Sequence, residues 1–197
     1  MTPYFKTTPE INYLESVNSF EYVRCENCGL VIAKTIYELD SNSLQKLNQD
    51  YFGSWQGTDF NADDPKWISR LKTQSKMFTE LFREKIFDTS WKSVDYGCGD
   101  GKLADMINSN FLQRDEVKSK SFDLVATFSV HEHLLGKSDV DKILNLIKPN
   151  GIFALHTLVA EEIPCDPDWF YLVPVHCTFW TNASMKIFFK QYTCHLK

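Results

Sequence analysis

The sequence predicts an α/β fold: a mostly parallel sheet with helices on both faces and a small N-terminal hairpin and helical appendage. Apolar strand candidates alternate with helical patterns from Pro65 onward, and a glycine-rich turn at 97–101 joins one strand to one helix. The first 64 residues lack this alternation. We therefore expect the appendage over residues 1–64 and the α/β domain over residues 65–197.

In the appendage, two short apolar segments flank a Cys-x-x-Cys-Gly turn, which predicts a hairpin. A helix is expected next, because Leu44 and Leu47 share a helical face. The following segment mixes Gly, Asn and Asp with aromatic residues, which predicts a loop. The expected elements are strands Phe20–Val23 and Leu30–Ala33, a helix Ser43–Tyr51 N-capped by Ser41 or Ser43, and a loop Tyr51–Asp64.

In the α/β segment, the apolar spacing changes repeatedly between helical and strand-like. Pro65 suits the first turn of a helix. The expected elements are a helix 65–87, a strand 91–96, a helix 102–107, a strand 122–128, a helix 140–147, a turn 148–151, a strand 152–159 and a helix 184–192 N-capped by Asn182 or Ser184.

Composition and charge restrict the function classes. The net charge of −5 and the pI near 5.5 disfavour a nucleic-acid binder that relies on a basic surface. No apolar run approaches the roughly 20 residues of a membrane helix, and the N-terminus lacks a signal pattern. We expect a cytoplasmic protein with reduced cysteines and a small-molecule partner, without membrane or nucleic-acid partners; the oligomeric state is left open.

The glycine turn carries the most functional information. Gly97, Gly99 and Gly101 alternate directly after an apolar strand, where open α/β sheets bind ligands. A dinucleotide fingerprint needs a third glycine where Lys102 stands. A phosphate-binding P-loop needs Gly where Tyr96 stands and Ser or Thr in place of Leu103. Both alternatives fail.

The segment Val94–Gly101 resembles motif I of the class I S-adenosylmethionine-dependent methyltransferases. Ser121–Val125 with Ser129–Leu134 resembles the fourth strand of that family and the loop after it, and Leu146–Gly151 resembles its turn into the fifth strand. The resemblance implies a Rossmann-like sheet and S-adenosylmethionine as the cofactor. The residues that it implies for cofactor binding are Asp95, Gly97, Cys98, Gly99, Gly101, Thr127, Phe128 and Ser129.

Two other segments indicate a sugar-like acceptor. Cys25-x-x-Cys28-Gly29 resembles the second half of a four-cysteine zinc ribbon that precedes bacterial methyltransferases of surface-polysaccharide and natural-product biosynthesis. Trp169–His176 and Phe179–Met185 resemble their substrate-side segment. Zinc needs four ligands, yet residues 1–24 contain neither Cys nor His. A hairpin turn with two reduced thiols is therefore favoured over a zinc site at Cys25 and Cys28.

Transfer of a methyl group to a hydroxyl or carbon requires removal of a proton, and histidine is the commonest base near neutral pH. We expect His176 first and His131 second in this role, with Tyr171 as a hydrogen-bonding aide. Glu132 and His133 are expected to fix a loop or cap a helix. A scaffold domain without catalysis and a quinone-type methyltransferase are the alternative functions.

The chain departs from the family in one interval. About 20 residues separate Gly101 from Phe122, too few for the two strands and two helices that the family places there. In the family, an acidic residue at the end of the second strand binds the cofactor ribose. Asp115 and Glu116 are the acids in this interval, and neither follows a clear strand. We expect a gap or jump across 108–115, and the start of a sixth strand at Thr193–Leu196.

Overall fold

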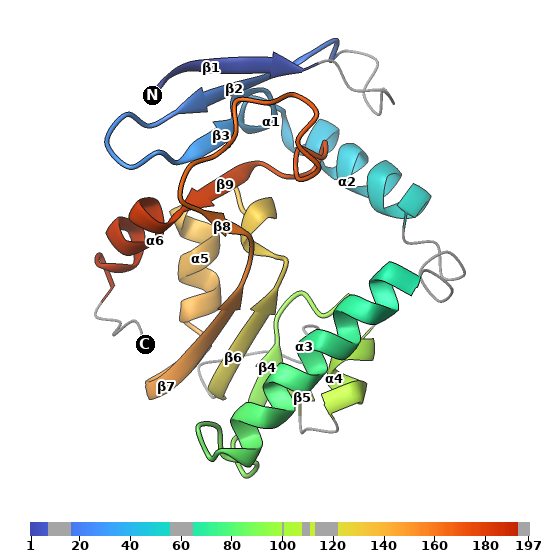
Figure 1. Ribbon diagram of the computed structural model, residues 1–197, viewed down its shortest axis with the longest axis vertical. Coiled ribbons are helices and arrows are strands. Elements are labelled where there is room, and N and C mark those ends of the chain that lie inside the picture. The colour runs from blue at the N-terminus through green and yellow to red at the C-terminus, as the bar shows by residue number, and fades with distance from the viewer. Residues whose placement is uncertain (8–16, 56–64, 100, 108–110, 113–121, 193–197) are drawn as a thin grey trace. The chain divides into compact units, whose positions relative to one another are not determined.

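The computed structural model describes residues 1–7, 17–55, 65–99, 101–107, 111–112 and 122–192 (Figure 1). The chain forms two compact units. The first contains Met1–Trp55, Glu132–Leu135 and Leu158–Lys197, and the second contains Gln56–His131 and Gly136–Thr157. This division differs from the expected segments 1–64 and 65–197, since the C-terminal segment clusters with the N-terminal one. The expected break at 108–115 and the expected strand at 193–196 lie almost wholly outside the described residues.

The first unit is built on a five-stranded sheet of order β1-β2-β3-β9-β8. Antiparallel pairs join β1 to β2, β2 to β3 and β3 to β9, whereas β8 runs parallel to β9. The expectation of one mostly parallel sheet is thus wrong for this unit, because antiparallel pairs dominate its sheet. The strands are β1 Thr2–Thr7, β2 Phe20–Arg24, β3 Val31–Ala33, β8 Val159–Ala160 and β9 Thr178–Thr181.

The hairpin β2–β3 confirms two predicted strands, whereas β1, β8 and β9 were not predicted. All four residues of β9 are buried, so the strand has no polar–apolar alternation that could reveal it. The extent of β9 depends on pairing with residues far away in the sequence, since Val31 pairs with Phe179 and Ile32 with Thr178.

Three helices complete this unit: α1 Lys34–Tyr37, α2 Ser41–Trp55 and α6 Asn182–Phe189. Asp40 caps α2, because its Oδ1 accepts hydrogen bonds from the backbone N–H groups of Asn42 and Ser43. The expected N-caps Ser41 and Ser43 lie inside the helix, and α2 continues into the segment expected to be a loop. Thr181, rather than Asn182 or Ser184, caps α6.

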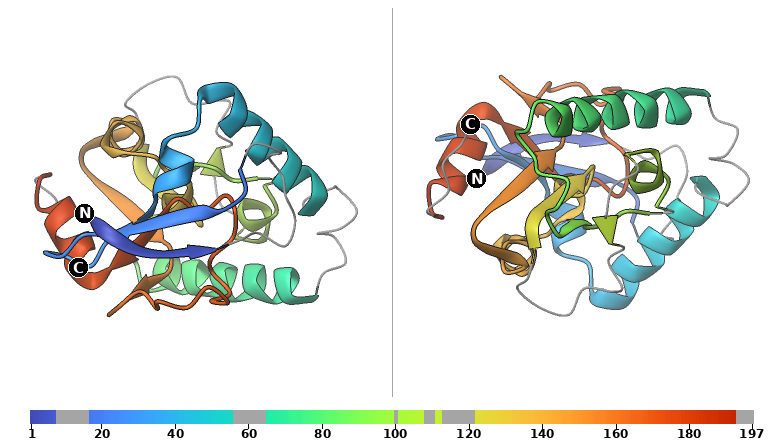
Figure 2. Two further views of the ribbon diagram at one scale, coloured as in Figure 1. Left: turned by 90° about the horizontal axis from the view of Figure 1, so that it is seen from above. Right: turned by 90° about the horizontal axis from the view of Figure 1, so that it is seen from below.

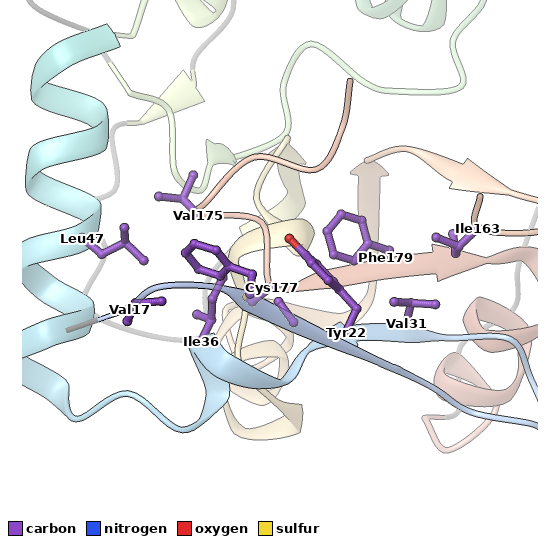
Figure 3. Packing of buried hydrophobic residues seen from close by; sticks show 11 residues of the cluster. Val17, Tyr22, Val31, Ile36, Leu47, Ile163, Val175, Cys177 and Phe179 are labelled. Atoms are coloured by element: carbon purple, nitrogen blue, oxygen red, sulfur yellow. The ribbon is translucent and has the colours of Figure 1, made fainter. Parts of the chain in front are cut away.

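The core of the first unit combines residues from its sheet, its helices and the segment before β9 (Figure 3). Phe179 is fully buried, with its ring centroid 5.8 Å from those of Tyr22 and Trp169. Figure 3 labels Val17, Tyr22, Val31, Ile36, Leu47, Ile163, Val175, Cys177 and Phe179 of this cluster. The N-terminal strands and the C-terminal strand therefore share one core.

The second unit contains a parallel sheet of order β5-β4-β6-β7. Three of these strands were predicted; β5 has only two residues and gives no sequence pattern. Val94 pairs with both Leu112 and Val125, and Ala126 pairs with Ala154. The strands are β4 Ser93–Asp95, β5 Phe111–Leu112, β6 Phe122–Phe128 and β7 Ile147–His156.

Helices cover both faces of this parallel sheet: α3 Pro65–Arg83 and α5 Lys137–Leu144 lie on opposite sides of it (Figure 2). Leu71 and Phe78 of α3 pack with Leu103 of α4, Lys102–Ile107, and with Leu124 of β6. α3 ends before Lys85, whose positive φ of 58° stops the helical repeat. α5 begins three residues before the expected 140–147.

The segment 148–151, predicted as a turn before the strand, lies within β7, where the pairing with β6 is irregular. Phe122 pairs with Ile147 and Leu124 with Ile152, so four residues of β7 face one residue of β6. Asn150 has a φ of 64°. A Cβ atom at Gly151 would lie 2.6 Å from Ile147 Cγ2, which explains glycine at this position.

Among the helices of the described ranges, none combines the length and the apolar character that crossing a membrane requires.

Thr181 offers a test of the first unit. Its buried hydroxyl accepts a hydrogen bond from Ser184 N at 3.1 Å and donates one to Cys28 O at 2.5 Å. Thr181→Ala removes the cap and leaves the Cys28 carbonyl without this donor, so unfolding free energy should fall by about 1–3 kcal/mol. Urea unfolding followed by tryptophan fluorescence measures the change. Thr181→Ser keeps the hydroxyl and should recover more than half of it; equal losses in both variants would contradict this role.

Candidate functional site

The carboxyl ends of β4 and β6 bring the predicted cofactor-binding residues of the second unit together. Asp95, the last residue of β4, pairs with Ala126, and Tyr96 N donates a hydrogen bond to Ala126 O at 2.9 Å. Thr127, Phe128 and Ser129 therefore lie at the same sheet edge as the turn that follows Asp95.

The three glycines of the turn all have positive φ: 80° at Gly97, 59° at Gly99 and 78° at Gly101. A Cβ atom at Gly97 would lie 2.7 Å from Val130 Cγ2, so packing alone accounts for this glycine. At Gly99, no atom of the described residues would lie within 4 Å of an added Cβ. The backbone of Gly99 is thus open to a ligand, whereas Gly97 is required by the fold.

Asp95 is the most perturbed acid of the described residues. Its side chain is 3% exposed, and its Oδ1 has no hydrogen-bond partner in the described part of the chain. Desolvation by burial raises the pKa of Asp95 from 3.8 to about 7. A buried carboxyl of this kind favours a ligand that brings a donor or a positive charge.

At the end of β6, Ser129 has a φ of 54°, and its N–H donates to His156 O at 2.9 Å. The predicted residue His131 is fully buried, with its Nδ1 3.5 Å from Thr127 Oγ1. Burial lowers the pKa of His131 to about 4. His131 is therefore neutral at pH 7 and belongs to the interior of the second unit.

The first unit contains a second polar cluster, formed by Glu132, His133, Tyr171 and His176. Glu132 and His133 lie in the short 3₁₀ helix η2, His131–His133. Cys177 N donates to Glu132 O at 2.7 Å, which fixes the Glu132–His133 segment beside His176. The predicted loop-fixing role of this segment agrees with these bonds.

Within this cluster, Tyr171 OH donates to Glu132 Oε1 at 2.8 Å. His176 Nδ1 lies 2.8 Å from Tyr171 O, and its ring centroid lies 4.8 Å from that of His133. Burial, with the His133 charge as a smaller cause, lowers the pKa of His176 to about 3. His176 and Tyr171, predicted separately as base and aide, are thus in direct contact.

The Cys25–Cys28 pair forms the turn of the β2–β3 hairpin. Cys25 N donates to Leu30 O and Gly29 N donates to Cys25 O, both at 2.8 Å, and Gly29 has a φ of 71°. Both thiols are free. Among the described residues, no third ligand-type side chain joins the pair, which forms the hairpin turn that the sequence favours.

Sequence reasoning missed the combination of Glu132, His133 and His176. One ligand atom of each lies within 4.8 Å of the others, the only such group of three among the described residues. The adjacent Glu132 and His133 are both metal-ligand residue types and could have indicated a site. His176, however, is far away in the sequence, and no motif connects the two segments. The predicted cofactor-binding residues and His131 belong to the second unit, whereas Tyr171 and His176 belong to the first.

No protein-family model matches the chain, and neither curated proteins nor solved structures include a detectable match.

Asp95 gives a pH-dependent prediction. Because its folded-state pKa of about 7 lies above the unfolded value, the folded state holds a proton that the unfolded state releases. The folded protein loses stability because of the raised pKa of Asp95, and this loss grows as pH rises from about 4 to about 7 and stays constant above pH 7. Between pH 5 and pH 8 the loss should increase by about 3 kcal/mol.

Asp95→Asn removes the titrating group. The difference in unfolding free energy between variant and wild type, measured by urea denaturation, should shift by this amount in favour of the variant as pH rises from 5 to 8. A difference that is independent of pH would show that Asp95 ionises normally in the folded protein.

Proposed function

We propose that this protein is an S-adenosylmethionine-dependent methyltransferase that acts on a small, sugar-like acceptor. The observation that carries the proposal is the buried Asp95 carboxyl at the end of β4, with the open backbone of Gly99 four residues later in the turn that follows. The methionine end of the cofactor carries an ammonium group and a carboxylate. Asp95 can bind the ammonium group, and backbone N–H groups of the turn can bind the carboxylate.

The parallel sheet supports the Rossmann-like part of this proposal. The resemblance assigns β4 as the first strand, β6 as the fourth and β7 as the fifth, and these three are adjacent and parallel. β5 follows β4 in the chain and pairs with it in parallel, so it is our candidate for the second strand. The ribose-binding acid expected after that strand falls outside the described residues.

The protein's contribution to methyl transfer is alignment, because the sulfonium of the cofactor is already electrophilic. Its residues have to hold the acceptor in line with the methyl group and exclude water. His131 remains our candidate in the second unit, and His176 with Tyr171, in the first unit, remain candidates from the resemblance alone. Both histidines have a lowered pKa, so both are neutral at pH 7 and weak as bases, which disfavours strong proton abstraction by either.

Cofactor binding can be tested by calorimetry with S-adenosylhomocysteine. Gly99→Ala puts a methyl group where the ligand would approach the backbone, so we expect affinity to fall at least tenfold. Gly136→Ala, whose added Cβ also meets no described atom within 4 Å, controls for the methyl group and should leave affinity unchanged. Because Gly99 has a φ of 59° and Gly136 an extended φ of −177°, circular dichroism is needed to verify that Gly99→Ala keeps the fold. No binding by the wild type, or equal binding by both variants, would favour the scaffold alternative.

Asp95 also predicts a proton linkage. If the ligand ammonium pairs with Asp95, binding lowers the pKa of that carboxyl below about 7 and releases its proton. Calorimetry at pH 6 in two buffers of different ionisation enthalpy should therefore report close to one proton released per S-adenosylhomocysteine bound. Asp95→Asn should abolish this release, and an unchanged release in the variant would exclude Asp95 as its source.

A further inference from the structure

We propose that Glu132, His133 and His176 bind one divalent transition-metal ion. Each offers a ligand atom, and these atoms lie within 4.8 Å of one another. Two imidazoles and a carboxylate form a ligand set typical of zinc and ferrous iron. All three residues lie in the first unit, so the inference rests on the geometry of that unit and not on methyl transfer.

The histidine rings are oriented as metal-binding histidines are. His133 Nδ1 lies 3.0 Å from Val175 O, and His176 Nδ1 lies 2.8 Å from Tyr171 O. A carbonyl oxygen can only accept, so Nδ1 is the donor in both rings and Nε2 carries the lone pair. Such a bond from the other ring nitrogen to a backbone carbonyl is the usual means of orienting a ligating histidine.

Glu132 supplies the negative charge. Its side chain is 1% exposed, and burial of a carboxylate is costly unless hydrogen bonds or a cation compensate it. Tyr171 OH donates to Glu132 Oε1 at 2.8 Å, and Leu158 N approaches the same hydroxyl oxygen at 3.4 Å. Tyr171 is therefore a positioning residue, which orients the carboxylate as the backbone carbonyls orient the two rings.

The backbone holds the two parts of this site together without a metal. Besides the bond from Cys177 N to Glu132 O, Thr178 Oγ1 donates to Leu134 O at 3.1 Å. Cys177 and Thr178 are buried, and β9 begins at Thr178. Binding of zinc would bring these three ligand atoms, which lie within 4.8 Å of one another, to about 2.0–2.2 Å from the ion.

Three protein ligands leave a tetrahedral zinc ion with one further position. Structural zinc sites use four protein ligands, whereas three plus a water is the arrangement of sites that bind an exchangeable oxygen ligand. We therefore infer that the fourth ligand is a water molecule or an oxygen of a bound small molecule.

The test is zinc binding by the whole chain after removal of metal with a chelator. Competition with a chromophoric chelator should give one zinc ion per chain in the double variant Cys25→Ser/Cys28→Ser, which removes the hairpin thiols as a second source of ligands. Cobalt substitution should show ligand-field bands without the intense near-ultraviolet absorption of thiolate ligation.

Glu132→Gln preserves side-chain size and the hydrogen bond with Tyr171 and should weaken zinc binding at least tenfold, as should His176→Asn. Tyr171→Phe should weaken it by about 10- to 100-fold through loss of orientation. His156→Asn, in the second unit, is the control and should bind zinc as the Cys25→Ser/Cys28→Ser variant does. Circular dichroism verifies folding of each variant.

Absence of zinc binding in the Cys25→Ser/Cys28→Ser variant would overturn the proposal, as would unchanged affinity when Glu132→Gln or His176→Asn is added to it and the protein still folds. Calorimetry with S-adenosylhomocysteine on the same samples tests the proposed methyltransferase function separately. Cofactor binding is expected whether or not the protein binds zinc.

Discussion

The antiparallel pairing of β3 with β9 is the contact on which the first unit depends. It joins Val31 to Phe179, both fully buried. Next to the paired residues, Ala33 N donates a hydrogen bond to the backbone O of Cys177, the residue before β9. The N-terminal hairpin alone would expose one face and one edge to water. Because β9 follows His176 and Cys177 immediately, the same pairing fixes the segment that holds η2 and its polar side chains.

The two polar clusters differ in how the protein compensates buried charge. Asp95 has lost water without gaining a hydrogen bond at Oδ1 among the described residues, and its pKa rises accordingly. Glu132 is as deeply buried but accepts a hydrogen bond from Tyr171, and its backbone is anchored to Cys177. The first arrangement favours a ligand with its own positive donor group. The second favours a bare cation between groups that are already oriented.

Local sequence patterns predicted those elements whose own residues form a recognisable apolar pattern, whichever partners they pair with. The hairpin β2–β3, the helix α3 and the strands β4, β6 and β7 were all expected, since their apolar residues recur at a regular spacing or form continuous runs. Element ends were less predictable. Asp40 and Thr181 cap their helices, although nearby serines or an asparagine suit the role equally by sequence. The residue that acts as the cap depends on the direction from which the preceding segment enters the helix.

By itself, the sequence determined the alternation of the second unit and the glycine turn after Asp95, because tight turns and buried strands impose strict local requirements. The tertiary structure decided that β8 and β9 join the N-terminal strands in one sheet, and that His176 meets Glu132 and His133. It also decided that Gly97 is required by Val130 whereas Gly99 is open. These features follow from contacts between residues far apart in the chain, whose pairing depends on burial and shape that no local pattern records.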